Sequence, residues 1–115
     1  MPAWLSEGDL DFYAAEFEHA GFFGGLCRYR NVDRDYEDLA AYADQPITIP
    51  SMFIGGSKDG PTVWGGASIS RFPETLPQLF KSEIIAGSGH WIQQEYAGET
   101  NALLIEFLAH VGSIT

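Results

Sequence analysis

The chain has 115 residues, which is the size of one small domain or of a part of a larger one. Hydrophobic residues make up 45% and charged residues 19%, a composition that is typical of a globular fold and excludes a disordered chain. Sixteen acidic residues against six basic ones give a net charge of -10, which argues against nucleic acid and anionic membranes as partners, because both bind basic surfaces.

Cys27 is the single cysteine, so no disulfide can form within the chain. The N-terminal residues lack the basic segment and the apolar core of a secretory signal peptide. No apolar stretch approaches the ~18 residues that a membrane-spanning helix needs. We therefore expect a protein of the reducing cytoplasm, with Cys27 as a small, partly buried side chain.

The first part of the chain is predicted to be helical. Ser6 and Asp9 form a capping box, and apolar residues then recur at helical spacing up to Gly21, which can close the helix. Gly24 and Gly25 are expected to break the chain before two further helices. A turn and a change in composition then indicate a boundary. The three predicted helices cover 7–20, 26–32, and a range from 33 or 34 to 43, and the first of them is amphipathic. The predicted boundary separates 1–45 from 46–115.

The second part is predicted to alternate strands and helices. Two short, uniformly apolar runs are typical of parallel strands that are buried on both faces. Two such strands do not make a stable sheet by themselves, so each needs a neighbour from elsewhere and the α/β fold is incomplete on its own. The predicted elements are a strand over 51–55, a loop over 60–66, a helix within 67–80 that Pro73 and Pro77 interrupt, a strand over 83–86 and a helix over 97–111.

Two polar side chains follow the predicted strands, at the strand ends where open α/β sheets place their chemistry. Asp59 follows the first strand, and His90 follows the second in the segment Gly87-Ser88-Gly89-His90. An acid that orients a histidine base is the Asp and His part of a hydrolase triad, but the nucleophile that should precede both has no match. Taken alone, Asp59 could also be a turn residue, and His90 could also be a loop histidine that caps a helix. For His90, the paired glycines Gly87 and Gly89 instead favour a sharp turn that presents its side chain.

Tyr29 is the third candidate for a site residue. Arg28 and Arg30 flank it, and nearby cations favour the phenolate and so strengthen the phenol as a hydrogen-bond donor. From composition alone, a structural tyrosine is the better interpretation. His19 and His110 have no comparable context and are interpreted as surface residues.

Four segments resemble, in order and at compatible spacing, the soluble epoxide hydrolases of the α/β-hydrolase superfamily. Two of them resemble late helices of that family's cap domain, including the motif that carries a lid tyrosine. The other two resemble its acid loop and its base loop. The segments are Trp4 to Tyr13, Gly24 to Asn31, Phe53 to Asp59, and Gly87 to Glu95.

The resemblance implies that 1–45 is the C-terminal part of a helical cap and 46–115 the C-terminal part of an α/β-hydrolase core. It implies that Tyr29 is one of a pair of lid tyrosines, Asp59 the charge-orienting acid and His90 the water-activating base. In the family, an aspartate opens the epoxide to an alkyl-enzyme ester, which the activated water hydrolyses to a vicinal diol. A small apolar epoxide is the implied substrate, and no metal or organic cofactor is needed.

The sequence departs from the family at two points. Cys27 and Arg28 replace the Asn-Trp that often precedes the lid tyrosine. The nucleophile, the oxyanion loop, the first strands and the partner tyrosine have no match. We therefore expect a C-terminal segment that is inactive alone and that associates with a missing N-terminal half or with itself.

Two alternatives stay open. One is a non-catalytic interaction module that keeps the surface of an α/β-hydrolase, and the other is a fragment of a different branch such as a haloalkane dehalogenase, against which the Tyr29 motif argues. Stable monomeric folding of the chain alone would favour the module. An open reading frame for the N-terminal half would favour the enzyme.

Overall fold

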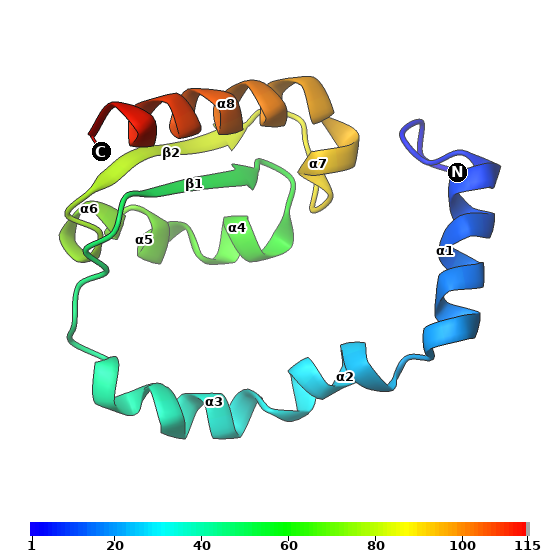
Figure 1. Ribbon diagram of the computed structural model, residues 1–115, viewed down its shortest axis with the longest axis horizontal. Coiled ribbons are helices and arrows are strands. Elements are labelled where there is room, and N and C mark those ends of the chain that lie inside the picture. The colour runs from blue at the N-terminus through cyan, green and yellow to red at the C-terminus, as the bar shows by residue number, and fades with distance from the viewer. Residues whose placement is uncertain (115) are drawn as a thin grey trace. The chain divides into compact units, whose positions relative to one another are not determined.

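The structure is a computed structural model that describes residues 1–114 (Figure 1). The chain divides into two compact units between Gln45 and Pro46. The elements of the first unit are all helices, and the second unit holds both strands and the remaining helices. That the two units are a cap and a core stays a prediction. Thr115, the last residue of the predicted second part, lies outside the described residues.

The first helix, α1, runs over Glu7–Ala20 as predicted, because local signals set both of its ends. The Asp9 carboxylate accepts hydrogen bonds from the backbone N–H and the hydroxyl of Ser6, at 3.0 and 2.6 Å, and Ser6 Oγ accepts from the Asp9 N–H at 3.1 Å. Gly21 ends the helix with a φ of 69°, which glycine adopts without steric strain. The apolar face is not buried by the described residues, and Phe17 keeps 47% of its surface exposed.

The next helices are α2, over Phe23–Arg30, and α3, over Val32–Leu39, followed by the 3-10 turn η1 over Ala40–Tyr42. The predicted break at Gly24 and Gly25 is wrong, because both residues lie in the first turn of α2. The N–H groups of a first turn have no partner inside the helix in any case, so a helix can begin at glycines without losing such bonds. Both predicted helix boundaries are therefore too late at their N-terminal ends.

Two parallel strands form the sheet of the second unit, as predicted. β1 runs over Ser51–Gly56 and β2 over Leu79–Ile85, and their carboxyl ends lie at the same edge. The second strand starts earlier than the predicted 83–86, because its first half contains polar residues that a search for apolar runs passes over. The ammonium group of Lys81 in that half lies 2.7 Å from the Glu106 carboxylate of the last helix, so this strand position is polar and paired.

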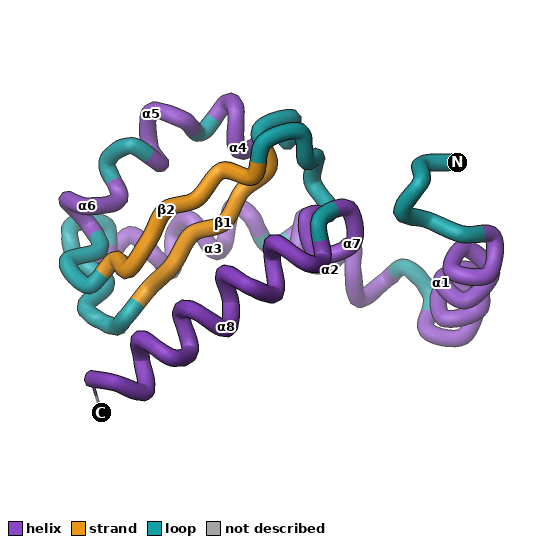
Figure 2. The backbone as a smooth tube through the Cα atoms, turned by 90° about the horizontal axis from the view of Figure 1, so that it is seen from above, coloured by secondary structure: helices purple, strands orange, loops and turns teal. Residues whose placement is uncertain are grey.

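Helices cover both faces of the two-stranded sheet (Figure 2). The long helix α8, over Ala97–Ile114, lies along one face, and the four-residue helix α7, over Ile92–Glu95, precedes it. Three short helices lie on the other face. No helix within residues 1–114 has the length and the apolar character that crossing a membrane requires. The three short helices are α4 over Gly60–Trp64, α5 over Gly66–Ile69 and α6 over Phe72–Thr75.

The predicted loop over 60–66 is wrong, because α4 occupies most of it, whereas the interrupted helix predicted within 67–80 is present as the two short helices α5 and α6. Asp59 caps α4 through its side chain, and Pro61 occupies the first turn, where the missing N–H of proline costs nothing. Pro73 likewise lies in the first turn of α6, so the predicted interruption falls just before it, between Ile69 and Phe72.

The apolar core of the second unit is small. Ile85 and Ile92 are the buried hydrophobic residues among those described, with 8% and 7% of their surface exposed. The His110 ring stacks on the Phe80 ring with centroids 4.5 Å apart, so His110 is half-buried and its interpretation as a surface residue is wrong. Ile84 on the same strand stays exposed, as expected of a sheet that has too few strands to bury both of its faces.

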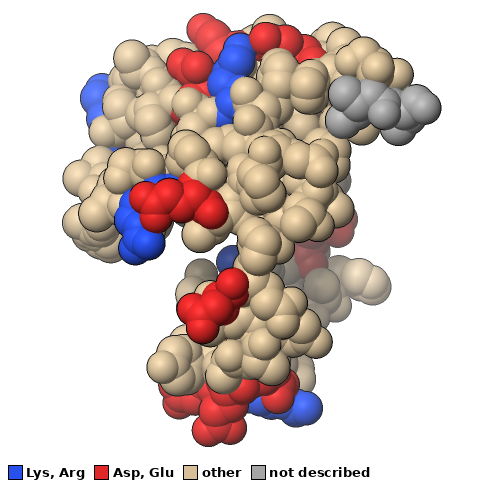
Figure 3. All heavy atoms as spheres, turned by 90° about the vertical axis from the view of Figure 1, so that its left-hand side faces the viewer, with Lys and Arg blue, Asp and Glu red and all other residues tan. Residues whose placement is uncertain are grey.

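Besides Lys81, two basic side chains pair with acidic ones, one from the turn before a helix and one from within the same helix. Arg71 is 2.9 Å from Glu74, and Arg34 is 3.4 Å from Asp38. On the face of the described residues that Figure 3 shows, blue Lys and Arg side chains are scattered among red acidic ones and form no broad patch. The absence of nucleic acid and membrane partners stays a prediction.

Candidate active site

Asp59 lies where the segment after β1 enters α4, and only 8% of its surface is exposed. Its Oδ2 accepts hydrogen bonds from the backbone N–H and the hydroxyl of Thr62, at 3.0 and 2.7 Å, and so caps the helix. The hydroxyl of Thr62 lowers the pKa of Asp59 below its ordinary value of 3.8, burial opposes this, and a hydrogen bond with His90 lowers the pKa further. Asp59 is therefore a carboxylate at neutral pH, with Oδ1 free of the helix cap.

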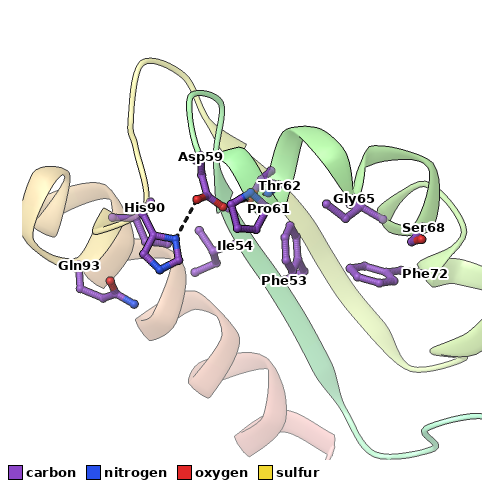
Figure 4. Close-up of a pocket in the computed structure, with 14 residues that line it drawn as sticks. Phe53, Ile54, Asp59, Pro61, Thr62, Gly65, Ser68, Phe72, His90 and Gln93 are labelled. Carbon is purple, nitrogen blue, oxygen red and sulfur yellow. Dashed lines mark hydrogen bonds and ion pairs between the residues drawn. The ribbon is translucent and has the colours of Figure 1, made fainter. Parts of the chain in front are cut away.

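His90 is the partner of Oδ1, the carboxylate oxygen of Asp59 that does not cap the helix (Figure 4). Its ring nitrogen Nδ1 lies 2.8 Å from Oδ1 of Asp59. A carboxylate accepts from a protonated Nδ1, so this contact favours the tautomer that carries its lone pair on Nε2. The side chain of His90 keeps 62% of its surface exposed, whereas that of Asp59 keeps 10%. An accessible basic nitrogen backed by a shielded carboxylate can take a proton from water.

Backbone hydrogen bonds join the two loops that carry this pair. The Ser57 N–H donates to the Ile85 carbonyl at 3.1 Å, and the Lys58 N–H donates to the Ser88 carbonyl at 2.9 Å. In the opposite direction, the Gly87 N–H donates to Ser57 Oγ at 2.8 Å. Ser88 is fully buried. Because these bonds tie the backbones together, they fix the separation of the acid and the histidine.

Glycine is required at two positions where the loops meet. Gly87 has a φ of 85°, which other residues adopt only with strain, so the sharp turn predicted from the paired glycines is confirmed at this residue. At Gly56, an added Cβ would collide with the carbonyl oxygen of Gly89. Only a residue without a side chain lets the end of β1 approach the histidine loop this closely.

Glu95 is not among the residues that the sequence predicts for the site, yet its carboxylate contacts the backbone on both sides of His90. Oε2 accepts from the Gly89 N–H at 2.6 Å, and Oε1 accepts from the Trp91 N–H at 3.0 Å. The Trp91 ring meets the His90 ring edge-on, with centroids 5.1 Å apart. The sequence offered one signal, an acid five residues after the histidine in the segment that resembles a base loop.

A cavity of about 410 Å³ lies beside the Asp59 and His90 pair, wholly within the second unit. Figure 4 shows the pair at one end of it and aromatic side chains further along. The rings of Phe53 and Phe72 meet there edge-on, with their centroids 5.2 Å apart. A mostly apolar cavity with a few convergent polar groups fits a small apolar molecule that reacts at one end. Other lining residues are Ile54, Ile69, Ile92 and Gln93.

Tyr29, the third predicted site residue, lies on α2 of the first unit with 74% of its surface exposed. Of the two arginines beside it, Arg30 places its guanidinium over the Phe23 ring, 5.4 Å from the centroid. A part for Tyr29 in catalysis stays a prediction. Residues 1–114 contain no group of three or more His, Cys, Asp or Glu side chains that could hold a metal ion. That the chemistry needs no cofactor also stays a prediction.

Known proteins match this chain over nearly all of its length. Epoxide hydrolase B of Mycobacterium tuberculosis is 51% identical over 108 residues, which cover 94% of this chain and 30% of that protein. The solved structure of an epoxide hydrolase from an endophytic Streptomyces is 52% identical, with a TM-score of 0.94, over 98% of this chain and 34% of that one. Epoxide hydrolase A from Mycobacterium thermoresistibile is 41% identical, with a TM-score of 0.84, over 95% of this chain and 34% of that one. No protein-family model matches the chain.

The chain thus spans about a third of the length of the relatives it matches. The predicted resemblance and the predicted incomplete α/β fold are both confirmed. By sequence and by fold, the chain corresponds to the C-terminal part of epoxide hydrolases of the α/β-hydrolase superfamily.

Proposed function

We propose that the chain supplies the histidine base and its orienting acid to an epoxide hydrolase, which converts an epoxide and water to a vicinal diol. The observation that carries this proposal is the 2.8 Å contact between His90 Nδ1 and Asp59 Oδ1, at the carboxyl ends of two parallel strands. Its support comes from the 51% identity to an epoxide hydrolase over the segment that contains both residues.

In the proposed reaction, an aspartate from outside this chain first opens the epoxide ring and forms an alkyl-enzyme ester. Tyr29 gives its proton to the epoxide oxygen as the C–O bond breaks, and it recovers a proton from the aspartic acid that ester hydrolysis later releases. Nε2 of His90 then takes a proton from water while the water oxygen bonds to the ester carbonyl carbon. Asp59 stabilises the imidazolium that forms. When the ester C–O bond breaks, the imidazolium returns its proton to the departing diol oxygen.

The substrate and the partner follow from the same proposal. A small apolar epoxide fits the cavity that Phe53 and Phe72 line, with its reacting carbons toward His90. The proposal takes the nucleophile from outside this chain, since both carboxylate oxygens of Glu95, the acid nearest the histidine loop, are bound to the Gly89 and Trp91 N–H groups. The chain alone is therefore expected to be inactive, and the catalytic unit is expected to be the complete assembly.

A graft tests this function directly. The matched third of the endophytic Streptomyces epoxide hydrolase is replaced by this chain, and diol formation from styrene oxide is measured. We expect diol from the graft and none from the chain alone. His90→Gln should abolish turnover yet leave the ester to accumulate, which mass spectrometry of the intact protein detects as the added mass of the substrate.

The neutral control is His19→Gln, because His19 is an exposed histidine of α1. A folded graft that forms neither ester nor diol would contradict the proposal and favour a non-catalytic module. Turnover of a haloalkane in place of the epoxide would favour the dehalogenase branch.

A further inference from the structure

One carboxylate bridges the two peptide groups that flank His90. The oxygens of Glu95 accept from the Gly89 N–H at 2.6 Å and from the Trp91 N–H at 3.0 Å. These are the N–H groups of the residues immediately before and after the histidine. Hydrogen bonds to a charged acceptor are stronger than those between neutral groups, so the bridge restrains the backbone on both sides of the ring.

The element that carries Glu95 is itself anchored. Glu95 ends α7, and the first residue of that helix, Ile92, is buried with 7% of its surface exposed. The hydroxyl of Thr100, which is 3% exposed, donates to the Ile92 carbonyl at 3.0 Å and ties α7 to α8. Because α7 is fixed to the long helix, the carboxylate is a rigid reference point for the loop and not a mobile surface group.

Helix capping explains only half of this arrangement. The bond to the Trp91 N–H satisfies a free donor at the start of α7, as a capping side chain would. The Gly89 N–H lies outside the helix, on the far side of His90, and no cap requires it. The approach is also close, because a Cβ added at Gly89 would lie 2.9 Å from Glu95 Oε1. The second bond therefore serves the loop that holds the histidine.

We propose that Glu95 is a positioning residue for His90, which holds the imidazole so that Nδ1 stays on Asp59 and Nε2 stays directed to the reacting water. This inference deepens the proposed function and rests on it. Glu95 touches neither substrate nor ring and acts only through the two peptide groups. Loss of the bridge lets the histidine shift, and a misplacement of about 1 Å can lower a rate about 100-fold.

The test uses Glu95→Gln in the graft. A glutamine amide has one oxygen and one NH₂ group, so it can accept from one of the two N–H groups and must turn a donor toward the other. The matched control is Glu99→Gln, which removes one negative charge from the exposed first turn of α8. Glu95→Asp is the second variant in case the amide prevents folding, because its shorter carboxylate cannot reach both N–H groups.

Two readouts are independent of turnover. The first is hydrogen exchange at the Gly89 and Trp91 amides, followed by NMR with labelled glycine and tryptophan. The second is the downfield proton signal of His90 Nδ1–H in its hydrogen bond with Asp59. We expect Glu95→Gln to speed exchange by about tenfold or more at the amide that loses its acceptor, and to weaken the Nδ1 signal. Glu99→Gln should leave both readouts unchanged.

The catalytic readout is the separation of kcat from KM. Glu95→Gln should lower kcat about 10- to 100-fold, with ester accumulating and KM not raised, since binding and ring opening do not need the base. Unchanged exchange and an unchanged Nδ1 signal would overturn the proposal, as would an unchanged kcat in an active graft. If the unmodified graft is folded but forms no diol, the proposed function fails, and the two NMR readouts still decide whether Glu95 holds His90 on Asp59.

Discussion

Asp59 takes part in two elements at once, because its two carboxylate oxygens have different partners. Oδ2 caps α4 through Thr62, and Oδ1 faces His90. The sequence allowed two interpretations of this residue, a local turn residue or the acid of a catalytic pair, and the structure combines a local cap with the contact to His90. The same helix cap that begins α4 therefore also fixes the carboxylate against which the histidine is oriented.

The first prediction concerns the titration of this carboxylate. In Thr62→Val the hydroxyl that donates at 2.7 Å is lost, while the backbone N–H still donates. The Thr62 hydroxyl is the largest cause of the lowered pKa, so we expect the pKa of Asp59 to rise toward 3.8 in the variant. NMR titration of the Asp59 carboxyl carbon measures this, and Thr62→Ser, which keeps the hydroxyl, is the control with a pKa that stays low.

The lowered pKa also gives a pH dependence of stability with a definite sign. Asp59 binds its proton less tightly in the folded chain than in the unfolded one, so its contribution is complete above the unfolded pKa near 3.8. That contribution is lost as the pH falls from there through the lowered folded value. Thr62→Val should therefore lose less stability than Thr62→Ser between pH 5 and pH 2. If the free energy of unfolding fell more steeply with decreasing pH in Thr62→Val than in Thr62→Ser, the Thr62 hydroxyl would not be the cause of the lowered pKa of Asp59.

Glu95 marks the limit of prediction at the residue scale. The meeting of Asp59 and His90 could be predicted because each follows a strand, and the ends of neighbouring parallel strands lie at the same edge of a sheet. The role of Glu95 depends on which backbone groups its side chain reaches, and that is set by how α7 packs on α8. The sequence shows that an acid is present at position 95, but it does not show in which direction α7 points the Glu95 side chain.

Among the elements, the sequence predicts those whose ends are set locally. The capping box of Ser6 and the left-handed Gly21 fixed both ends of α1 to the residue. The segment Asp59-Gly60-Pro61 fits a turn and the start of a helix equally well, because aspartate, glycine and proline are common in both. Packing decides between the two, and here Phe72 contacts Phe53 across the sheet face that these short helices cover.

The second prediction concerns the approach of two elements, the end of β1 and the histidine loop. Gly56→Ala places a Cβ against the Gly89 carbonyl oxygen, where backbone and not a flexible side chain must move. We expect the free energy of unfolding of the graft to fall by about 1–3 kcal/mol, as for other overpacked sites. We also expect turnover to fall, because the loops move apart and lengthen the Asp59 to His90 contact.

Gly66→Ala is the matched control for this change. Gly66 begins α5, and an added Cβ there meets nothing within 4 Å. Alanine should be neutral there or stabilise the graft by roughly 0.4–1 kcal/mol, because it restricts the unfolded chain. Chemical denaturation of both variants measures the difference, and equal midpoints for the two would show that the loops do not depend on close backbone approach at Gly56.

At the scale of the whole molecule, the net charge opposes association between copies of the chain, whereas the uncovered apolar surface favours it. The net charge of -10 makes copies of the chain repel one another at neutral pH. Large apolar side chains nonetheless stay exposed in both units, among them Phe23, Tyr36 and Ile49 at 70%, 81% and 67%. Neither the nucleophile nor the surfaces that would cover these residues could be predicted, because this sequence has no segment that matches them.

The third prediction follows from that balance. Near the isoelectric point of about 4.4 the repulsion vanishes while the apolar surface remains, so we expect the chain alone to associate progressively as the pH falls from 7 toward 4.4. Light scattering after gel filtration gives the mass at each pH. Raising the salt concentration at pH 7 should act in the same direction, because it screens the like charges without altering protonation.

The graft is the control that distinguishes association through exposed apolar surface from association through the loss of charge repulsion. It presents the same chain with its apolar faces covered by the rest of the relative, so association near the isoelectric point of the graft itself should be much weaker. A chain that stays monomeric at every pH and unfolds cooperatively would show that it buries enough surface by itself. That outcome would favour a self-sufficient interaction module over a part that needs a larger enzyme to cover it.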